Sequence, residues 1–170
     1  MKKAFLASIL IIVSLVVALL FLNQRPRFAG VSLSQNEYHH VTKSRKQVDA
    51  MLTDFEGFNH SPKQKLAAIK SDADQIWQSN AKQLGVHDQA KLKEALYGNQ
   101  GIVSLAENAN KGNYRIDSSI ASLLDKDFQV VIIKSTSPLN HSSASREKII
   151  DQLNRQLKAE SRLYHLANQQ

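Results

Sequence analysis

The feature that most constrains the fold of this chain is a series of apolar stripes with a period of three or four residues, separated by glycines. The clearest stripe lies between Ser61-Pro62, a favourable helix start, and Gly85, which ends the pattern. This spacing places the apolar side chains on one face of a helix, because an α-helix has 3.6 residues per turn. The members of the stripe are Leu66, Ile69, Ala73, Ile76, Trp77, Ala81 and Leu84.

Similar stripes occur along most of the remaining chain, and we find no internal repeat. We therefore predict a mainly α fold, a small helical bundle in which the apolar stripes face one another. Trp77 is interpreted as a core residue rather than a ligand-stacking one. Further helices are predicted over 35–55, 88–97, 102–109 and 144–167, with another turn or two after Asp117.

Residues 128–134 fit two different elements. Their continuous, β-branched composition predicts a buried strand by propensity. A lone strand leaves its backbone unsatisfied, and only 114–116 and 31–33 offer short partners. The alternative is the buried end of a helix that begins at Ser118, and a short apolar run does not decide between the two. The predicted bundle therefore contains at most one or two short strands, around 128–134.

An uncharged apolar run, residues 4–22, follows Lys2 and Lys3 at the start of the chain. A membrane-spanning helix needs about 20 such residues, whereas the apolar region of a cleaved secretory signal has about 7–15. Cleavage after Ala29 would place Arg27 where a small residue is required. The sequence therefore predicts a signal anchor that stays attached, with an unusually long cleaved signal as the alternative.

These observations predict a single-pass membrane protein that contacts the lipid bilayer through residues 4–23. Lys2 and Lys3 favour a cytoplasmic N-terminus and a folded domain outside the cytoplasm, whereas Arg25 and Arg27 oppose that orientation. The predicted segments are a cytoplasmic tail (1–3), a transmembrane anchor (4–23), a juxtamembrane linker (24–34), a single helical domain (35–167) and a C-terminal tail (168–170).

The composition excludes several kinds of chemistry. The chain has no cysteine, which removes disulfides, thiol catalysis and cysteine-ligated metal sites. Its net charge of +7 suits an anionic lipid or wall polymer, but it is too diffuse to predict nucleic-acid binding. One basic group is concentrated enough to contact such an anionic surface, although it also serves as a topology signal and a solvated helix face. Its members are Arg25, Arg27, Lys43, Arg45 and Lys46.

The loop 135–145 is the best enzymatic candidate, because it combines five serines with Thr136 and His141. No known nucleophile motif orders these side chains, so a flexible loop whose last serines cap the next helix is the favoured interpretation. The six histidines are scattered, and no two lie four residues apart on one helix. We therefore predict no catalytic residue, no metal site and no cofactor.

The resulting hypothesis is a membrane-anchored, extracytoplasmic helical protein that acts by binding or scaffolding in the cell envelope, without catalysis. Its partner would be another envelope protein or an anionic wall polymer. Two alternatives stay open: an envelope enzyme of the hydrolase kind that uses the loop 135–145, and a basic, membrane-tethered protein that faces the cytoplasm.

Overall fold

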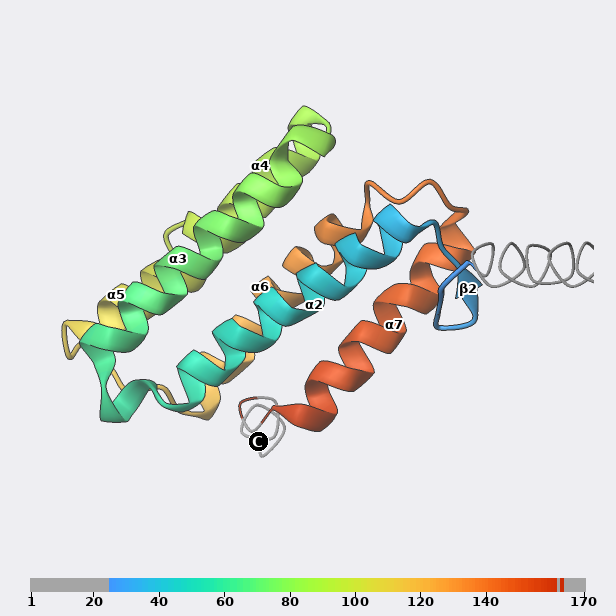
Figure 1. Cartoon of the computed structure of the whole chain (residues 1–170). Helices are drawn as coiled ribbons and strands as arrows, with labels where there is room; N and C mark the ends of the chain where they lie inside the picture. The colour runs from blue at the N-terminus through green and yellow to red at the C-terminus, as the bar shows by residue number, and fades with distance from the viewer. Residues whose placement is uncertain (1–24, 162, 164–170) are drawn as a thin grey trace, which may run out of the picture.

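The computed structural model describes residues 25–161 and 163, and helices dominate this part of the chain. The prediction of a mainly helical bundle is confirmed (Figure 1). In chain order the elements are β1 (Arg27–Phe28), β2 (Val31–Ser32), α2 (Gln35–Glu56), η1 (Phe58–His60), α3 (Pro62–Asn80), η2 (Ala81–Gln83), α4 (Val86–Tyr97), α5 (Ile102–Asn110), α6 (Ser118–Thr136) and α7 (Ser143–Glu160), with η denoting a 3₁₀ helix.

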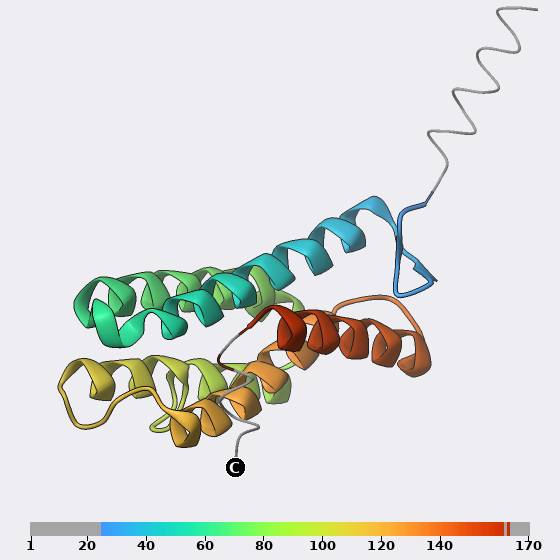
Figure 2. The same ribbon diagram turned by 90° about the horizontal axis from the view of Figure 1, so that it is seen from below.

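Short connections between the helices decide which helices lie next to each other. Gly57 ends α2, and the following turn returns the chain so that α3 packs along α2. Seen from below, α2 and α3 lie in one layer, and α5 and α6 lie in the other (Figure 2). Helix α6 packs against α2, α4 and α7, so it connects the layer that contains α2 to its own layer.

The core is continuous through these layers and contains a cluster of three phenylalanines. The rings of Phe55 and Phe58 are stacked with centroids 5.9 Å apart, and Phe55 meets Phe128 edge to face at 6.3 Å. All three side chains are fully buried. Each such burial stabilises the fold by about 1.5–3 kcal/mol. Trp77 packs at the edge of this core as a half-buried side chain, which agrees with its interpretation as a core residue.

The strand predicted around 128–134 is wrong, and the helical alternative is correct, because these residues form the second half of α6. A helix satisfies its backbone internally, whereas a strand here would have needed a partner. Asp117 starts the helix by accepting hydrogen bonds from the N–H groups of Ser119 and Ile120. Tertiary packing outweighs the β-propensity, since α2, α4 and α7 all contact α6. Its buried residues within this stretch are Phe128, Val131 and Ile132.

The two short strands lie instead within 24–34, the segment predicted as a linker. Strands β1 and β2 pair with each other as an antiparallel hairpin, with Phe28 opposite Val31. Ala29 and Gly30 have positive φ angles of 52° and 76°, the conformation of a tight hairpin turn that suits the twist of the strands. Leu33 is fully buried just after the hairpin, so this segment belongs to the folded domain.

The prediction of a single-pass membrane protein with a transmembrane signal anchor is contradicted. Within the described residues, no helix is long and apolar enough to cross a membrane. The reason is that these helices are amphipathic: α7, for example, alternates buried leucines with lysines, arginines and acids. The segments predicted as the anchor (4–23) and as the two tails (1–3 and 168–170) lie outside the described residues.

The last helix is shorter than the stripe over 144–167 predicts. Helix α7 ends at Glu160, and Ser161 adopts an extended conformation. The Ser161 hydroxyl donates to Glu56 Oε1 at 2.9 Å and accepts the Leu163 N–H at 3.2 Å. Leu163 is buried. These contacts turn the chain away from the helix axis and attach it to the C-terminal end of α2.

Candidate functional site

The start of α2 is built around Glu37, which closes a reciprocal helix cap with Ser34. Ser34 precedes the helix, and its hydroxyl accepts the Glu37 N–H at 3.3 Å. In return, Glu37 Oε2 accepts the Ser34 N–H at 2.9 Å and the Ser34 hydroxyl at 2.8 Å. This arrangement satisfies backbone donors that a helix start leaves without intrahelical partners.

The same carboxylate ties α2 to the loop that follows α6. Glu37 Oε1 accepts the Asn140 N–H at 3.1 Å and lies 3.4 Å from His141 Nε2. The Ser34 N–H, the Ser34 hydroxyl, the Asn140 N–H and the charge of His141 together hold the pKa of Glu37 below its ordinary value, against an opposing effect of burial. Glu37 therefore stays ionised at neutral pH and joins two parts of the chain that are about a hundred residues apart.

The end of α6 meets the start of α2 at this point. The last four carbonyl oxygens of a helix have no intrahelical partner, and here all four are satisfied. Ile133 O accepts the Thr136 and Ser137 hydroxyls, and the next carbonyl, of Lys134, accepts the Ser137 N–H. Thr136 O accepts the Leu139 N–H. The remaining carbonyl, of Ser135, lies 2.7 Å from His40 Nε2.

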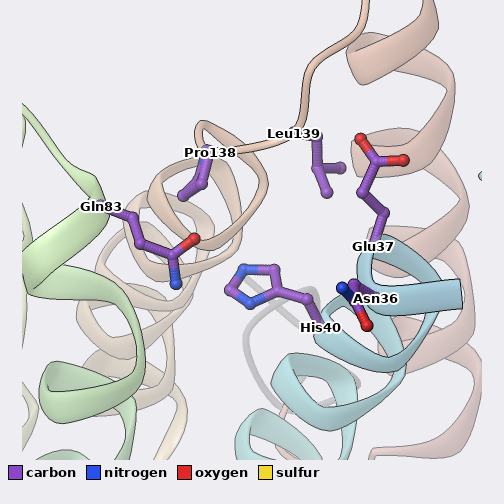
Figure 3. Close-up of a pocket in the computed structure, with 6 residues that line it drawn as sticks. All are labelled: Asn36, Glu37, His40, Gln83, Pro138 and Leu139. Atoms are coloured by element: carbon purple, nitrogen blue, oxygen red, sulfur yellow. The ribbon is translucent and has the colours of Figure 1, made fainter. Parts of the chain in front are cut away.

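A cleft of about 220 Å³ opens where α2, η2 and the α6–α7 loop meet (Figure 3). Helix α2 supplies one wall, Gln83 projects from η2 on the opposite side, and the loop covers a third side. The His40 ring lies in the middle of the cleft, between the amides contributed by α2 and η2. The lining residues are Asn36, Glu37, His40, Gln83, Pro138 and Leu139.

Several polar groups of the cleft are not used by the fold. A carbonyl oxygen only accepts hydrogen bonds, so His40 Nε2 donates to Ser135 O, and in the tautomer that carries only this proton Nδ1 is an acceptor. Gln83 Nε2 donates one of its two hydrogens to Ser79 O at 3.1 Å, and no partner for Oε1 is found among the described residues. No hydrogen bond to the exposed Asn36 amide is found among the described residues. The cleft therefore offers mainly acceptors.

Four hydroxyl groups of the loop 135–145, those of Thr136, Ser137, Ser142 and Ser145, form local hydrogen bonds. Ser142 caps α7 by accepting the Ser145 N–H at 3.3 Å, and its hydroxyl also donates to Ser145 Oγ. The Ser135 hydroxyl is buried without a hydrogen-bond partner among the described residues. The structure brings His40 and His141 to the same corner, but in the described residues neither imidazole is hydrogen-bonded to a hydroxyl of this loop. A nucleophile activated by either imidazole would need such a hydrogen bond.

The five basic residues predicted to contact an anionic surface are divided between two elements. Arg25 and Arg27 are exposed at the hairpin, whereas the other three lie on α2. Lys43 and Lys46 are exposed three residues apart and share a helix face. Arg45 points to another side and lines a small apolar cavity between α2, α6 and α7. The anionic contact stays a prediction, with Arg45 separated from the other four.

The histidines do not assemble into a metal site in the described part of the chain, where no group of three or more histidine or acidic side chains could hold an ion. His39 contacts Gln35, His60 is exposed in η1, and His87 lies in the first turn of α4. His165 lies outside the described residues.

Sequence reasoning misses most of the cleft. Only the Ser34-x-x-Glu37 spacing carries a recognisable signal, because it is the pattern of a reciprocal helix cap. Gln83 and Asn36 are ordinary polar residues near helix ends, and nothing in their local sequence indicates that they face each other across a cleft.

No protein-family model, curated protein or solved structure matches this chain.

Proposed function

We propose that this protein is a non-enzymatic binding or scaffolding protein of the cell envelope, and that its helical domain recognises a partner through the cleft between α2, η2 and the α6–α7 loop. The observation that carries the proposal is the set of cleft acceptors for which the described part of the chain supplies no partner, Gln83 Oε1 and His40 Nδ1. Polar groups that can be reached by solvent and are not used internally are the groups that orient a ligand.

The size of the cleft favours part of a partner over a whole small molecule. Pockets for drug-sized ligands usually have volumes of about 300–1,000 Å³. A cleft of about 220 Å³ suits a single side chain of another protein. Docking of one side chain into a preformed cleft is a common way to anchor an interface.

Photo-cross-linking in living cells tests this proposal. A photoreactive amino acid at position 82 would sit beside the cleft, because Lys82 is exposed and precedes Gln83 without lining the cleft. The matched control is position 63, since Lys63 is equally exposed at the opposite end of α3, roughly 30 Å away along the helix. We expect position 82 to give a specific adduct that position 63 does not give. The yield of this adduct should fall when Gln83 is changed to Leu. Equal adducts from both positions would contradict the proposal.

Two further experiments address the alternatives. A reporter fused after Gln170 that is active only outside the cytoplasm tests the proposed location, and activity on the cytoplasmic side would contradict it. Alanine substitution of Ser143, an exposed serine of the loop 135–145 that neither lines the cleft nor caps a helix, and separately of Ser145, tests the enzyme alternative. A binding protein keeps its cellular function in each variant that folds, whereas an enzyme that uses one of these hydroxyls loses it.

A further inference from the structure

We infer that the cleft binds a cationic nitrogen group, an ammonium or a guanidinium, such as the end of a lysine or arginine side chain. This inference rests on the proposed function, because it names the chemical class that the same cleft would recognise. Three independent properties of the cleft support it: its hydrogen-bond acceptors, its electrostatics and its apolar wall.

The hydrogen-bonding groups of the cleft match a donor. Gln83 Oε1 is an amide oxygen and only accepts hydrogen bonds, and His40 Nδ1 is an acceptor in the tautomer whose Nε2 donates to Ser135 O. Among the described lining residues, the side-chain N–H groups without a partner are those of the Asn36 amide and the second N–H of Gln83 Nε2. Ammonium and guanidinium groups have donors and no acceptors, so they satisfy this arrangement better than a carboxylate or a phosphate does.

The charge distribution around the cleft also favours a cation. Glu37 lies at its rim as a carboxylate, and among the described residues that line the cleft none is a lysine or an arginine, although the exposed Lys82 precedes Gln83. The C-terminal end of α6 and the start of α2 both lie at the cleft, and the terminal carbonyls of α6 are already hydrogen-bonded, so the Glu37 carboxylate is the group that favours a cation. The nearest lysine on α6, Lys134, is held by Asp88 at 2.6 Å and is therefore already neutralised.

The apolar part of the lining suits the hydrocarbon portion of such a side chain. Pro138 and Leu139 form the wall contributed by the α6–α7 loop (Figure 3). Lysine and arginine commonly lay their methylene groups along apolar surface while their charged ends reach polar partners. A side chain that enters along this wall would bring its charged end toward His40 and Gln83.

Titrations of the full chain followed by amide chemical shifts test the inference. The chain would be purified in a non-ionic detergent, because residues 4–22 are apolar. The cationic probes are n-butylammonium, n-butylguanidinium and a capped Gly-Lys-Gly peptide. The peptide distinguishes a side chain on a polypeptide from a free amine. The matched comparisons are butyrate, which reverses the charge, and N-butylacetamide, which is neutral and polar.

We expect the cationic probes to shift the amide signals of the cleft residues, and butyrate to leave them unchanged. Gln83→Leu and, separately, Asn36→Ala change exposed side chains, so both variants should fold normally. Loss of the Gln83 acceptor should weaken ammonium binding about tenfold, as expected for a hydrogen bond to a charged group. Gln64→Leu, an exposed glutamine at the other end of α3, should leave it unchanged.

Two results would overturn the inference. If N-butylacetamide bound as tightly as n-butylammonium, the cleft would be a binding site without preference for a cation, and only the proposed function would stand. If butyrate bound more tightly than n-butylammonium, or if no probe shifted the amide signals of the cleft residues, the inference that the cleft binds a cationic group would be wrong. In that case cross-linking from position 82 would show separately whether the cleft still meets a partner.

Discussion

Replacement of Asp127 by Asn should stabilise this protein at neutral pH. Asp127 is half-buried on α6, where burial and the nearby charge of Glu94 raise the pKa of its carboxyl to about 6, against a smaller opposing effect of Lys126. The ordinary value is 3.8. The folded protein therefore binds a proton more tightly than the unfolded chain, and ionising Asp127 costs folding free energy at neutral pH.

The magnitude follows from the difference between the two pKa values. About two pKa units correspond to about 3 kcal/mol at 1.36 kcal/mol per unit. Solvent screens a half-exposed side chain, so we expect Asp127→Asn to raise the free energy of unfolding by about 1 kcal/mol at pH 7.5. As the pH falls from about 6 toward 4, the native carboxyl becomes protonated and the advantage of the variant should disappear.

Urea unfolding of the full chain and the variant at pH 7.5 and pH 4 measures this effect. Asp151→Asn is the matched control, because Asp151 is exposed in the middle of α7 and should give no such difference at either pH. A variant that is equally stable or less stable than the natural chain at pH 7.5 would refute the reasoning. An advantage of the same size at both pH values would also refute it.

Three further changes test individual contacts, two within the bundle and one at the start of α2. Gly101→Ala should destabilise the fold by more than about 1 kcal/mol in urea unfolding, because an added Cβ would lie 2.6 Å from the carbonyl oxygen of Glu94. Asn59→Asp should cost about 1 kcal/mol by the same assay, because its amide donates to Ile116 O at 2.9 Å and an ionised carboxylate is unable to donate. Glu37→Gln should cost about 1 kcal/mol at pH 7 through the loss of the charged helix cap, and that difference should shrink as acid protonates Glu37 below pH 4.5, as pH-dependent unfolding would show.

The helices could be predicted because their signals are local. The start at Ser61-Pro62 and the end at Gly57 need only neighbouring residues to be recognised, and both agree with the observed bounds of α3 and α2. Residues 128–134 show the limit of such signals. Their β-branched composition is compatible with a strand or a helix, and the packing of α6 against α2, α4 and α7 decides the outcome.

The cleft was beyond prediction for a different reason. It depends on contacts between residues far apart in the chain, such as the 95 positions that separate His40 from Ser135. The sequence indicates that the loop 135–145 contains serines that cap the next helix, and Ser142 does cap α7. It gives no indication that the histidine at position 40 closes the end of α6, or that Gln83 lies opposite it.

The most direct test of the central claim is competition for the cross-link at the cleft. An adduct formed from position 82 would be measured in isolated cell envelopes with increasing n-butylammonium, and separately with butyrate at the same concentrations. We expect n-butylammonium to suppress the adduct and butyrate to leave it intact, because a cationic side chain of the partner occupies the cleft. An adduct that both probes leave unchanged, or that butyrate suppresses instead, would contradict the assignment of this cleft as the binding site for a cationic partner.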